Sequence, residues 1–253
     1  MTDMEERQLS VVTVEERGPV SVIAINRPEK LNAINKAVAV ELQQAFAAFD
    51  RSDQRVAILT GLGGRAFSSG ADVTDLPELW RCVPTVGIAT DKPIIAAVAG
   101  WCIGGGLVMA MMCDLLVAAD TARFSYPEGK VGITGGMIAG LAARIPHKVA
   151  MEMMLVGEPI DAARAYEVGL ANRVVAAGSE IDEAVAMAEK IVDLAPLALA
   201  AMKRFVNGGV LPKGPAELMA RYGAELGAVR NSEDAAEGVR AFREKRRPRY
   251  QGR

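Results

Sequence analysis

The sequence predicts an α/β fold that gives way to a helical C-terminal region. Short apolar runs alternate with helix-like patterns over the first two thirds of the chain, and strand-like runs nearly vanish after about Gly135. Of the 253 residues, 51% are hydrophobic and 24% are charged, which is typical of a soluble protein with a sizeable core. This composition excludes a disordered chain and a disulfide-stapled mini-protein.

The α/β part is expected to contain four buried strands and one amphipathic helix. The first strand is an apolar run between Gly18-Pro19 and Pro28, and the later strands are equally short buried runs. In the helix, apolar residues recur with the spacing of one helical face. The predicted strands are 20–26, 56–60, 94–98 and 115–119, and the predicted helix is 36–50.

Helical patterns fill the chain after Gly135, and we expect them to form a helical layer on the α/β core. They cover residues 137–144, 148–155, 161–167, 181–194, 215–228 and 234–243. Because no low-complexity linker separates them from the core, we predict one compact unit with a helical extension. We place the α/β core in residues 1–190 and the C-terminal helical region in residues 191–253.

The charge balance excludes several classes of partner. A formal net charge of −2 creates no global field that would attract nucleic acid or anionic lipid. The most apolar stretch, 107–112, is far too short to span a bilayer, so we expect no membrane association. The sequence begins without a signal-peptide pattern, and its three cysteines form no CxxC pair. We interpret Cys82, Cys102 and Cys113 as reduced, buried thiols of a cytoplasmic protein.

The single histidine limits the possible chemistry. His147 starts an apolar-periodic segment, where a helix-start role is favoured. Zinc ligands are not clustered anywhere in the sequence, so no metal site is expected. Ser68 and Ser69 have no plausible histidine partner, which argues against a serine peptidase. We therefore expect chemistry that runs without histidine.

The C-terminus is strongly basic, with six Lys or Arg residues among the last eleven. A solvated tail is one interpretation of this run. A phosphate contact is the other, because Arg and Lys both bind phosphate oxygens. The sequence alone leaves both open.

Two glycine-rich segments, each at the end of a buried strand, are the candidate sites of chemistry. The first runs over 60–72 (TGLGGRAFSSGAD), and the second over 100–106 (GWCIGGG) into an apolar helix. Consecutive glycines cost backbone entropy and are typical of close backbone approach. If the two turns faced each other, two backbone N–H groups could bind one oxygen as an oxyanion hole. Tight packing without a ligand is the alternative.

An oxyanion hole needs an acid or a base beside it. Asp114 lies between a helix and a buried strand, where a structural hydrogen bond is expected. Asp120 has the position of an ordinary turn aspartate. Glu128 follows a strand in an irregular segment (FSYPEG), from which its carboxylate could point into a pocket.

Taken together, these segments resemble the enoyl-CoA hydratase/isomerase (crotonase) superfamily. The resemblance covers nearly the whole chain, with similar motifs in the same order. They are 26–33 (NRPEKLNA), 66–72 (AFSSGAD), 92–106, 162–175 and 241–246 (AFREKR).

The resemblance implies a crotonase-like spiral of β-β-α units, followed by a C-terminal helical trimerisation region, and a homotrimer or a hexamer built as a dimer of trimers. It implies an acyl-CoA thioester as substrate, with CoA as part of the substrate and no separate cofactor. By motif position, Ala71 and Gly105 supply the oxyanion N–H groups and Glu128 is the catalytic acid/base. The implied substrate and CoA contacts are Lys30, Leu31, Ala33, Ser69, Asp72, Val73, Trp101, Gly104, Val108, Pro127 and Gly136.

Two positions depart from the family pattern. Typical hydratases have a second glutamate three residues after the oxyanion glycine, where this chain has Val108, and some other members have an aspartate where this chain has Gly136. Glu128 is therefore the single acid kept at a known catalytic position. Since moving a double bond needs only one base, we expect isomerisation of an enoyl-CoA. Hydration by Glu128 alone, or acyl-CoA binding without catalysis, are the alternatives.

Overall fold

Two sheets organise the computed structural model, which describes residues 10–132 and 134–253. The larger sheet has the strand order β1-β2-β3-β5-β7-β10 and is parallel apart from the β1/β2 pair. Its strands are β1 (Val12–Arg17), β2 (Val20–Ile25), β3 (Val56–Gly61), β5 (Ile94–Val98), β7 (Leu115–Ala119) and β10 (Arg173–Val175). The smaller sheet has the order β4-β6-β8-β9, formed by β4 (Ala66–Ser68), β6 (Trp101–Ile103), β8 (Arg123–Ser125) and β9 (Ile160–Asp161).

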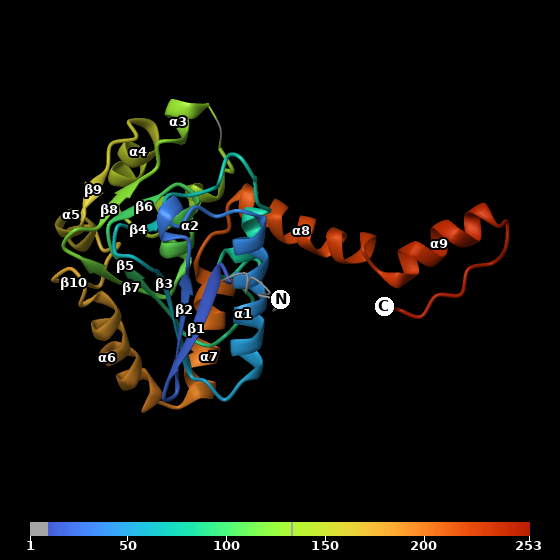
Figure 1. Cartoon of the computed structure of the whole chain (residues 1–253), viewed down its shortest axis with the longest axis horizontal. Helices are drawn as coiled ribbons and strands as arrows, with labels where there is room; N and C mark the ends of the chain where they lie inside the picture. The colour runs from blue at the N-terminus through green and yellow to red at the C-terminus, as the bar shows by residue number, and fades with distance from the viewer. Residues whose placement is uncertain (1–9, 133) are drawn as a thin grey trace, which may run out of the picture.

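From β3 to β8, consecutive strands alternate between the two sheets. β3, β5 and β7 lie in the larger sheet, and each is followed by a strand of the smaller one, β4, β6 and β8. Helix α2 (Gly105–Met112) follows β6 and is buried throughout. The chain therefore winds as a spiral of β-β-α units, which confirms the predicted fold class (Figure 1).

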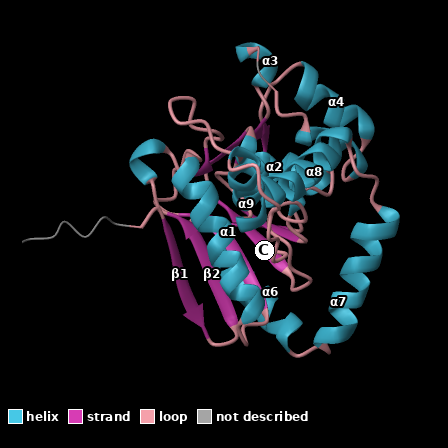
Figure 2. Ribbon diagram, turned by 90° about the vertical axis from the view of Figure 1, so that its right-hand side faces the viewer, coloured by secondary structure: helices cyan, strands magenta, loops and turns pink. Residues whose placement is uncertain are grey.

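The larger sheet is covered on both faces, which explains its continuous apolar strands. Ile23, Ile25 and Leu59 pack in the main core with α1 (Lys36–Arg51) and α2. Val22 and Ile58 point to the other face and pack against α6 (Glu180–Val192). Figure 2 shows α1 crossing the sheet beside β1 and β2.

Helices and turns complete the chain. They are η1 (Pro28–Lys30), η2 (Leu79–Cys82), α3 (Glu128–Val131), η3 (Met137–Ala143), α4 (His147–Leu155), α5 (Ala162–Glu167), α7 (Pro196–Phe205), η4 (Val206–Val210), α8 (Pro215–Arg230) and α9 (Glu233–Arg243). Helix α7 lies along the body, held by the ion pairs Lys203–Asp114 at 2.7 Å and Arg204–Asp91 at 2.6 Å. Helix α8 begins against η2 and η3, where Glu217 is buried, and the rest of α8 and α9 project away from the body (Figure 1). The expected helical layer on the core is therefore wrong for α9 and for most of α8, which form an extension instead.

The sequence predictions hold best for the long apolar runs. The four predicted strands are all present, and His147 starts α4 as expected. The strands β1, β4, β6, β8, β9 and β10 and helix α7 were not predicted. Most of them are too short or too polar to show a repeating hydrophobic pattern. The helix predicted over residues 137–144 is present as a 3-10 helix over 137–143, and Glu128 begins a short helix rather than an irregular segment.

Within the described residues, no helix is both long and apolar enough to cross a membrane. Cys82 and Cys102 are buried free thiols, while Cys113 is only partly buried, so the expectation of three buried cysteines is wrong for Cys113.

Candidate active site

The two glycine-rich turns lie against each other. Gly70 has φ +91°, and a Cβ atom added there would lie 2.9 Å from the carbonyl oxygen of Ile103 and 3.3 Å from the amide nitrogen of Gly105. A side chain at position 70 would therefore collide with the second turn. The two segments, about 35 residues apart in sequence, form one close contact between the end of β4 and the start of α2.

Hydrogen bonds fix the second turn at the start of α2. The Gly104 amide donates to the Ser125 carbonyl at 3.0 Å, which ties the turn to the end of β8. Gly104 has φ +53°, a conformation that favours glycine. A Cβ on Gly106 would lie 2.8 Å from the Ser68 carbonyl oxygen, so glycine lets α2 approach β4. Positive φ at Gly104 and close approach at Gly106 thus explain two of the three consecutive glycines.

The backbone amides of Ala71 and Gly105 flank this contact. Ala71 is held by its neighbours, since Ile34 N–H donates to the Gly70 carbonyl and Asp72 N–H donates to the Ile34 carbonyl, both at 2.8 Å. Within residues 10–132 and 134–253, neither the Ala71 amide nor the Gly105 amide donates a hydrogen bond. Gly105 is also the first residue of α2, where the helix leaves its N–H groups unpaired. Two unpaired amides that point at one oxygen can stabilise negative charge on it, which is the role predicted for Ala71 and Gly105.

The carboxylate of Glu128 lies beside the same turn. A Cβ added at Gly104 would lie 3.5 Å from Glu128 Oε1. The other oxygen, Oε2, accepts a hydrogen bond from the hydroxyl of Tyr126. One oxygen of a partly buried carboxylate therefore faces the glycine turn, and the other is engaged by the protein.

The Tyr126 ring is buried, with 4% of the residue exposed. Its hydroxyl also shares a 3.0 Å hydrogen bond with Thr134 Oγ1, which accepts from the Gly136 amide. Burial and the hydrogen bond to Glu128 raise the pKa of Tyr126 well above its ordinary value. The phenol therefore stays protonated and remains a donor. No pattern in the sequence marks Tyr126, since its partner is recognised only in three dimensions.

The loop over residues 27–33 lies beside the first turn. Asn32 is fully buried and donates from Nδ2 to the carbonyls of Leu62 and Ala66, at 2.9 and 2.7 Å. The Ser69 amide donates to the Leu31 carbonyl at 2.9 Å. The expected CoA contacts Lys30, Leu31, Ala33 and Ser69 are thus brought together on one side of the turns. Asn32, which was not among the residues selected from the sequence, fixes their position.

The Asp72 carboxylate faces the protein. It accepts from the Thr74 hydroxyl at 2.6 Å and the Thr74 amide at 3.1 Å, and it pairs with Arg27 at 3.2 Å. The contacts with Thr74, followed by that with Arg27, lower the pKa of Asp72. Arg27 also donates to the Ala33 carbonyl at 2.6 Å, so this cluster connects the loop to the first turn. Arg27 was likewise not selected from the sequence.

The other expected contacts lie at different distances from the turns. Val108 is buried on α2, and Pro127 immediately precedes Glu128. Gly136 immediately precedes η3 and is linked to Glu128 by hydrogen bonds through Thr134 and Tyr126. Val73 is 76% exposed, and Trp101 starts β6, at the strand end away from Gly104. The structure thus brings Val108, Pro127 and Gly104 to the turns but leaves Trp101 apart.

Leu79 forms an apolar wall over the second turn. A Cβ on Gly105 would lie 2.9 Å from Leu79 Cδ1 and 3.5 Å from Ile34 Cδ1. Leu79 belongs to η2, which follows the first turn in sequence. An acyl group bound at the two amides would therefore meet apolar side chains on this side.

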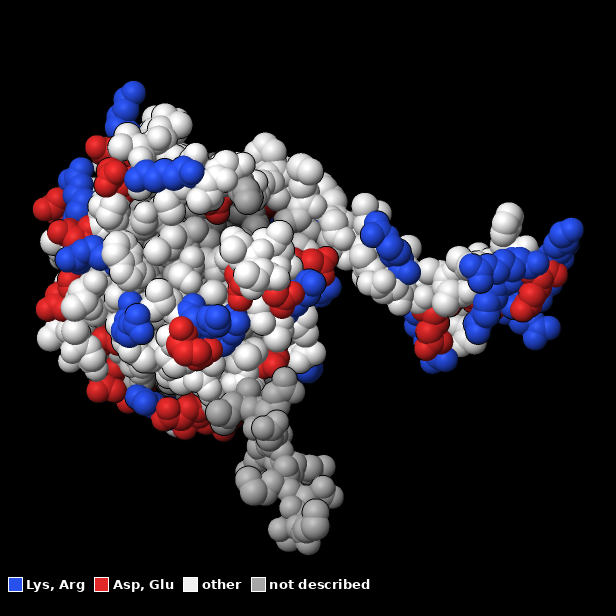
Figure 3. Space-filling view, turned by 45° about the horizontal axis from the view of Figure 1, so that its top comes forward, with Lys and Arg blue, Asp and Glu red and all other residues white. Residues whose placement is uncertain are grey.

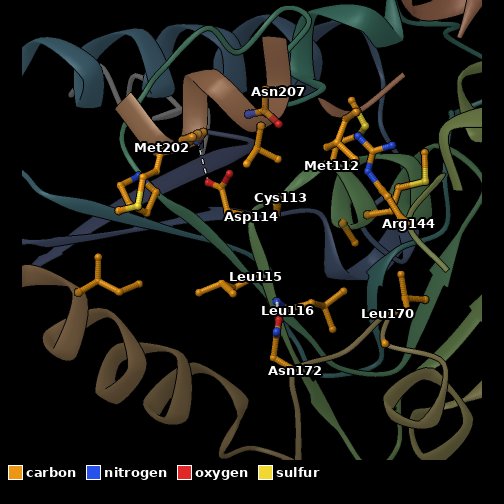
Figure 4. A pocket seen from close by; sticks show the side chains of 18 of the residues that line it. Met112, Cys113, Asp114, Leu115, Leu116, Arg144, Leu170, Asn172, Met202 and Asn207 are labelled. Carbon is orange, nitrogen blue, oxygen red and sulfur yellow. Dashed lines mark hydrogen bonds and ion pairs between the residues drawn. The ribbon is translucent and has the colours of Figure 1, made fainter. Parts of the chain in front are cut away.

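A cavity of about 460 Å³ lies elsewhere, at the C-terminal end of α2 (Figure 4). The carboxylate of Asp114 in its wall accepts from the Ile94 amide and from Lys203, both at 2.7 Å. This confirms the structural hydrogen bond expected of Asp114. Within the described residues, no group of three His, Cys, Asp or Glu side chains could hold a metal ion.

Comparison with known proteins identifies the family. The family model described as enoyl-CoA hydratase/isomerase matches residues 15–253. The chain belongs to this family. The resemblance carried by the sequence motifs is thereby confirmed, and with it an enzyme that processes acyl-CoA thioesters.

Curated members of the enoyl-CoA hydratase/isomerase family match over nearly their full length. The (E)-benzylidenesuccinyl-CoA hydratase of Thauera aromatica is 36% identical, covering 95% of this chain and 99% of its own. The carnitinyl-CoA dehydratase of Citrobacter koseri is 37% identical, covering 93% and 96%. Both relatives are named for the addition or removal of water.

Solved structures of family members have the same fold. The enoyl-CoA hydratase of Mycobacterium tuberculosis H37Rv superposes with a TM-score of 0.73 at 38% identity, covering 96% of this chain and 100% of the other. The carnitinyl-CoA hydratase of Mycobacterium avium superposes with a TM-score of 0.74 at 35% identity, covering 96% and 99%.

Proposed function

We propose that this family member moves the double bond of an enoyl-CoA thioester, with Glu128 as its single acid/base. The observation that supports this is the composition of the site around the glycine turns. Glu128 Oε1 faces Gly104, while position 108 on α2 is a valine that is only 2% exposed. One carboxylate is enough for a proton shuttle between two carbon atoms.

In the proposed reaction, the thioester oxygen of a 3-enoyl-CoA accepts hydrogen bonds from the Ala71 and Gly105 amides. The Glu128 carboxylate removes a proton from the α-carbon, and the electron pair of that C–H bond delocalises into a dienolate. The negative charge on the thioester oxygen is stabilised by the two amides. Protonated Glu128 then returns the proton to the γ-carbon, which gives the 2-enoyl-CoA and restores the carboxylate.

The CoA part of the substrate would lie along the loop over residues 30–33 and the first turn. Lys30 is exposed there and could meet a phosphate, while Leu31, Ala33 and Ser69 border the path to the two amides. Because the Asp72 carboxylate is paired with Arg27, its backbone rather than its charge would contact CoA.

Hydration is the second candidate, and the names of the curated relatives favour it. In that reaction Glu128 alone would orient the attacking water and supply the α-proton. In hydration, the one carboxylate must both orient the water and deliver a proton to the α-carbon. In isomerisation, it only removes one proton and returns it. The two reactions differ in the mass of the product.

The test is turnover of 2-enoyl-, 3-enoyl- and 3-hydroxyacyl-CoA thioesters by the wild type and by Glu128→Gln, with Asp120→Asn as a matched control. We expect a 3-enoyl-CoA to rearrange without a mass change and Glu128→Gln to lose about a hundredfold or more in kcat. Asp120 is exposed and lies in a turn, so its variant should match the wild type.

Three other outcomes would contradict the proposed isomerisation or the role of Glu128 in it. A product heavier by one water would favour hydration. Activity of Glu128→Gln within about threefold of the wild type would remove Glu128 from the mechanism. Acyl-CoA binding without any turnover would favour a non-catalytic binding protein.

A further inference from the structure

The hydroxyl of Tyr126 is held in a fixed place next to the proposed base. The ring is buried in the main core, and the adjacent residue, Ser125, is tied to Gly104 through its carbonyl. The phenol oxygen therefore has little freedom to move relative to the glycine turn. It donates to Glu128 Oε2 from this position.

Glu128 itself lacks comparable support from its own element. It is the first residue of α3, a helix of four residues, and it is only partly buried. A glutamate side chain has several rotatable bonds, and ordering them costs free energy that packing does not supply here. A hydrogen bond to one carboxylate oxygen removes much of that freedom, and it leaves the other oxygen directed at Gly104.

The donor chain extends one residue further. Since the phenol hydrogen is used on Glu128, the Thr134 hydroxyl donates to the phenol oxygen and accepts from the Gly136 amide. A run of donors thus leads from Gly136 through Thr134 and Tyr126 to Glu128. Such chains fix the direction of each hydroxyl hydrogen.

We propose that Tyr126 is a positioning residue, which orients Glu128 so that Oε1 faces the α-carbon of the bound thioester. This inference rests on the proposed function, because it requires Glu128 to act as the acid/base. Tyr126 transfers no proton itself; it holds the carboxylate from the side opposite to the substrate. Catalytic groups need such support, because a small misplacement of the base lowers the rate strongly.

The test uses Tyr126→Phe, which keeps the buried ring and removes only the hydroxyl. We expect kcat to fall about ten- to hundredfold, as for the loss of a hydrogen bond to a charged group, with KM within about threefold. Tyr166→Phe is the matched control, because Tyr166 is 57% exposed on α5 and loses the same hydroxyl. Its kcat should equal that of the wild type.

A double variant separates positioning from a structural role. If Tyr126 acts only through Glu128, adding Tyr126→Phe to Glu128→Gln should change the residual rate by less than about twofold. Additive losses, or a Tyr126→Phe enzyme within twofold of the wild type in kcat, would overturn the inference. If Glu128→Gln is itself as active as the wild type, the proposed function fails as well, so the two failures can be told apart.

A partition measurement covers the case in which the Tyr126→Phe protein is partly unfolded. In heavy water, the fraction of product that has taken up deuterium counts how often the abstracted proton escapes before its return. This fraction is a property of each turnover and does not depend on how much enzyme is active. A misoriented carboxylate should raise it in Tyr126→Phe, and an unchanged fraction together with an unchanged kcat per folded enzyme would contradict the role.

Discussion

The side chain at position 108 determines how many acids the site contains. Val108 is 2% exposed on the first turns of α2, a helix in which every residue is buried and apolar. Typical hydratases of the family have a glutamate at this position, so a glutamate here would add the second carboxylate of that pattern to α2. The residue at a single position thus separates one-acid from two-acid chemistry in this site.

We therefore expect Val108→Glu to increase hydration of a 2-enoyl-CoA if the chain has any hydratase activity. The measurement is the amount of product that is heavier by one water, with Val108→Gln as a control of similar size without charge. Because the new carboxylate would be buried, the variant should also be less stable than the wild type. No gain over Val108→Gln would count against hydration with Glu128 as the present acid.

At the scale of elements, the site depends on how closely α2 approaches β4. The contact at Gly106 is to the Ser68 backbone, which cannot rotate away as a long side chain could. Strand β4 ends three residues before Ala71, and α2 begins at Gly105. A shift of α2 would therefore separate the two proposed oxyanion amides as well as loosen the core.

We expect Gly106→Ala to lower the free energy of unfolding by about 1–3 kcal/mol, the usual cost of overpacking. Gly223→Ala on α8 is the control, because a Cβ there meets nothing within 4 Å. Replacing a helical glycine should instead stabilise the chain by about 0.5–1 kcal/mol. Urea unfolding at one fixed protein concentration measures both variants. Equal stability of Gly106→Ala and the wild type would show that α2 can move without cost.

The basic C-terminal segment folds back on α9. Glu237 accepts from Arg246 at 2.6 Å and from the Arg249 amide at 2.9 Å, and these contacts lower the pKa of Glu237 to about 2. Figure 3 shows basic and acidic side chains side by side at the end of the extension. The C-terminal basic residues were one candidate for a phosphate contact. Carboxylates of α9 neutralise part of their positive charge.

At the scale of the whole molecule, the extension exposes large apolar side chains. On α8 and α9 these include Met219 at 74%, Leu226 at 61%, Val229 at 68% and Phe242 at 85% exposed. A helical arm with such a surface gains free energy by packing against other chains. This surface favours self-association, and the homotrimer or hexamer implied by the family resemblance stays a prediction.

We expect a mass in solution of three or six times the 26.8 kDa chain, measured by light scattering after gel filtration. Leu226→Asp should shift the mass toward the monomer, because it puts a charge into the apolar surface of α8. Leu155→Asp is the control, since Leu155 is 76% exposed on the body in α4. A wild-type monomer, or equal effects of both variants, would contradict assembly through the extension.

The sequence by itself determined the elements whose signal is local. Residues 94–98 and 115–119 are apolar runs ended by polar or small residues, and the structure has strands at these same bounds. The motifs also identified the family, because they stand in order along the chain. Glycine at positions 70 and 104–106 marked the turns, since close approach and positive φ restrict the residue type strongly.

Only the tertiary structure decided which side chains meet. The strands of the smaller sheet have two or three residues each, which is too few to show the alternating hydrophobic pattern of a strand. They pair only because the spiral brings them together. In the same way, Asn32 reaches Ala66 and Leu79 lies over Gly105. Thr134 bonds to the Tyr126 hydroxyl, which in turn bonds to Glu128. Most of these contacts join different elements, and their geometry follows from packing rather than from local propensity. The sequence therefore determined the class of chemistry, while the fold determined how the Glu128 carboxylate is held.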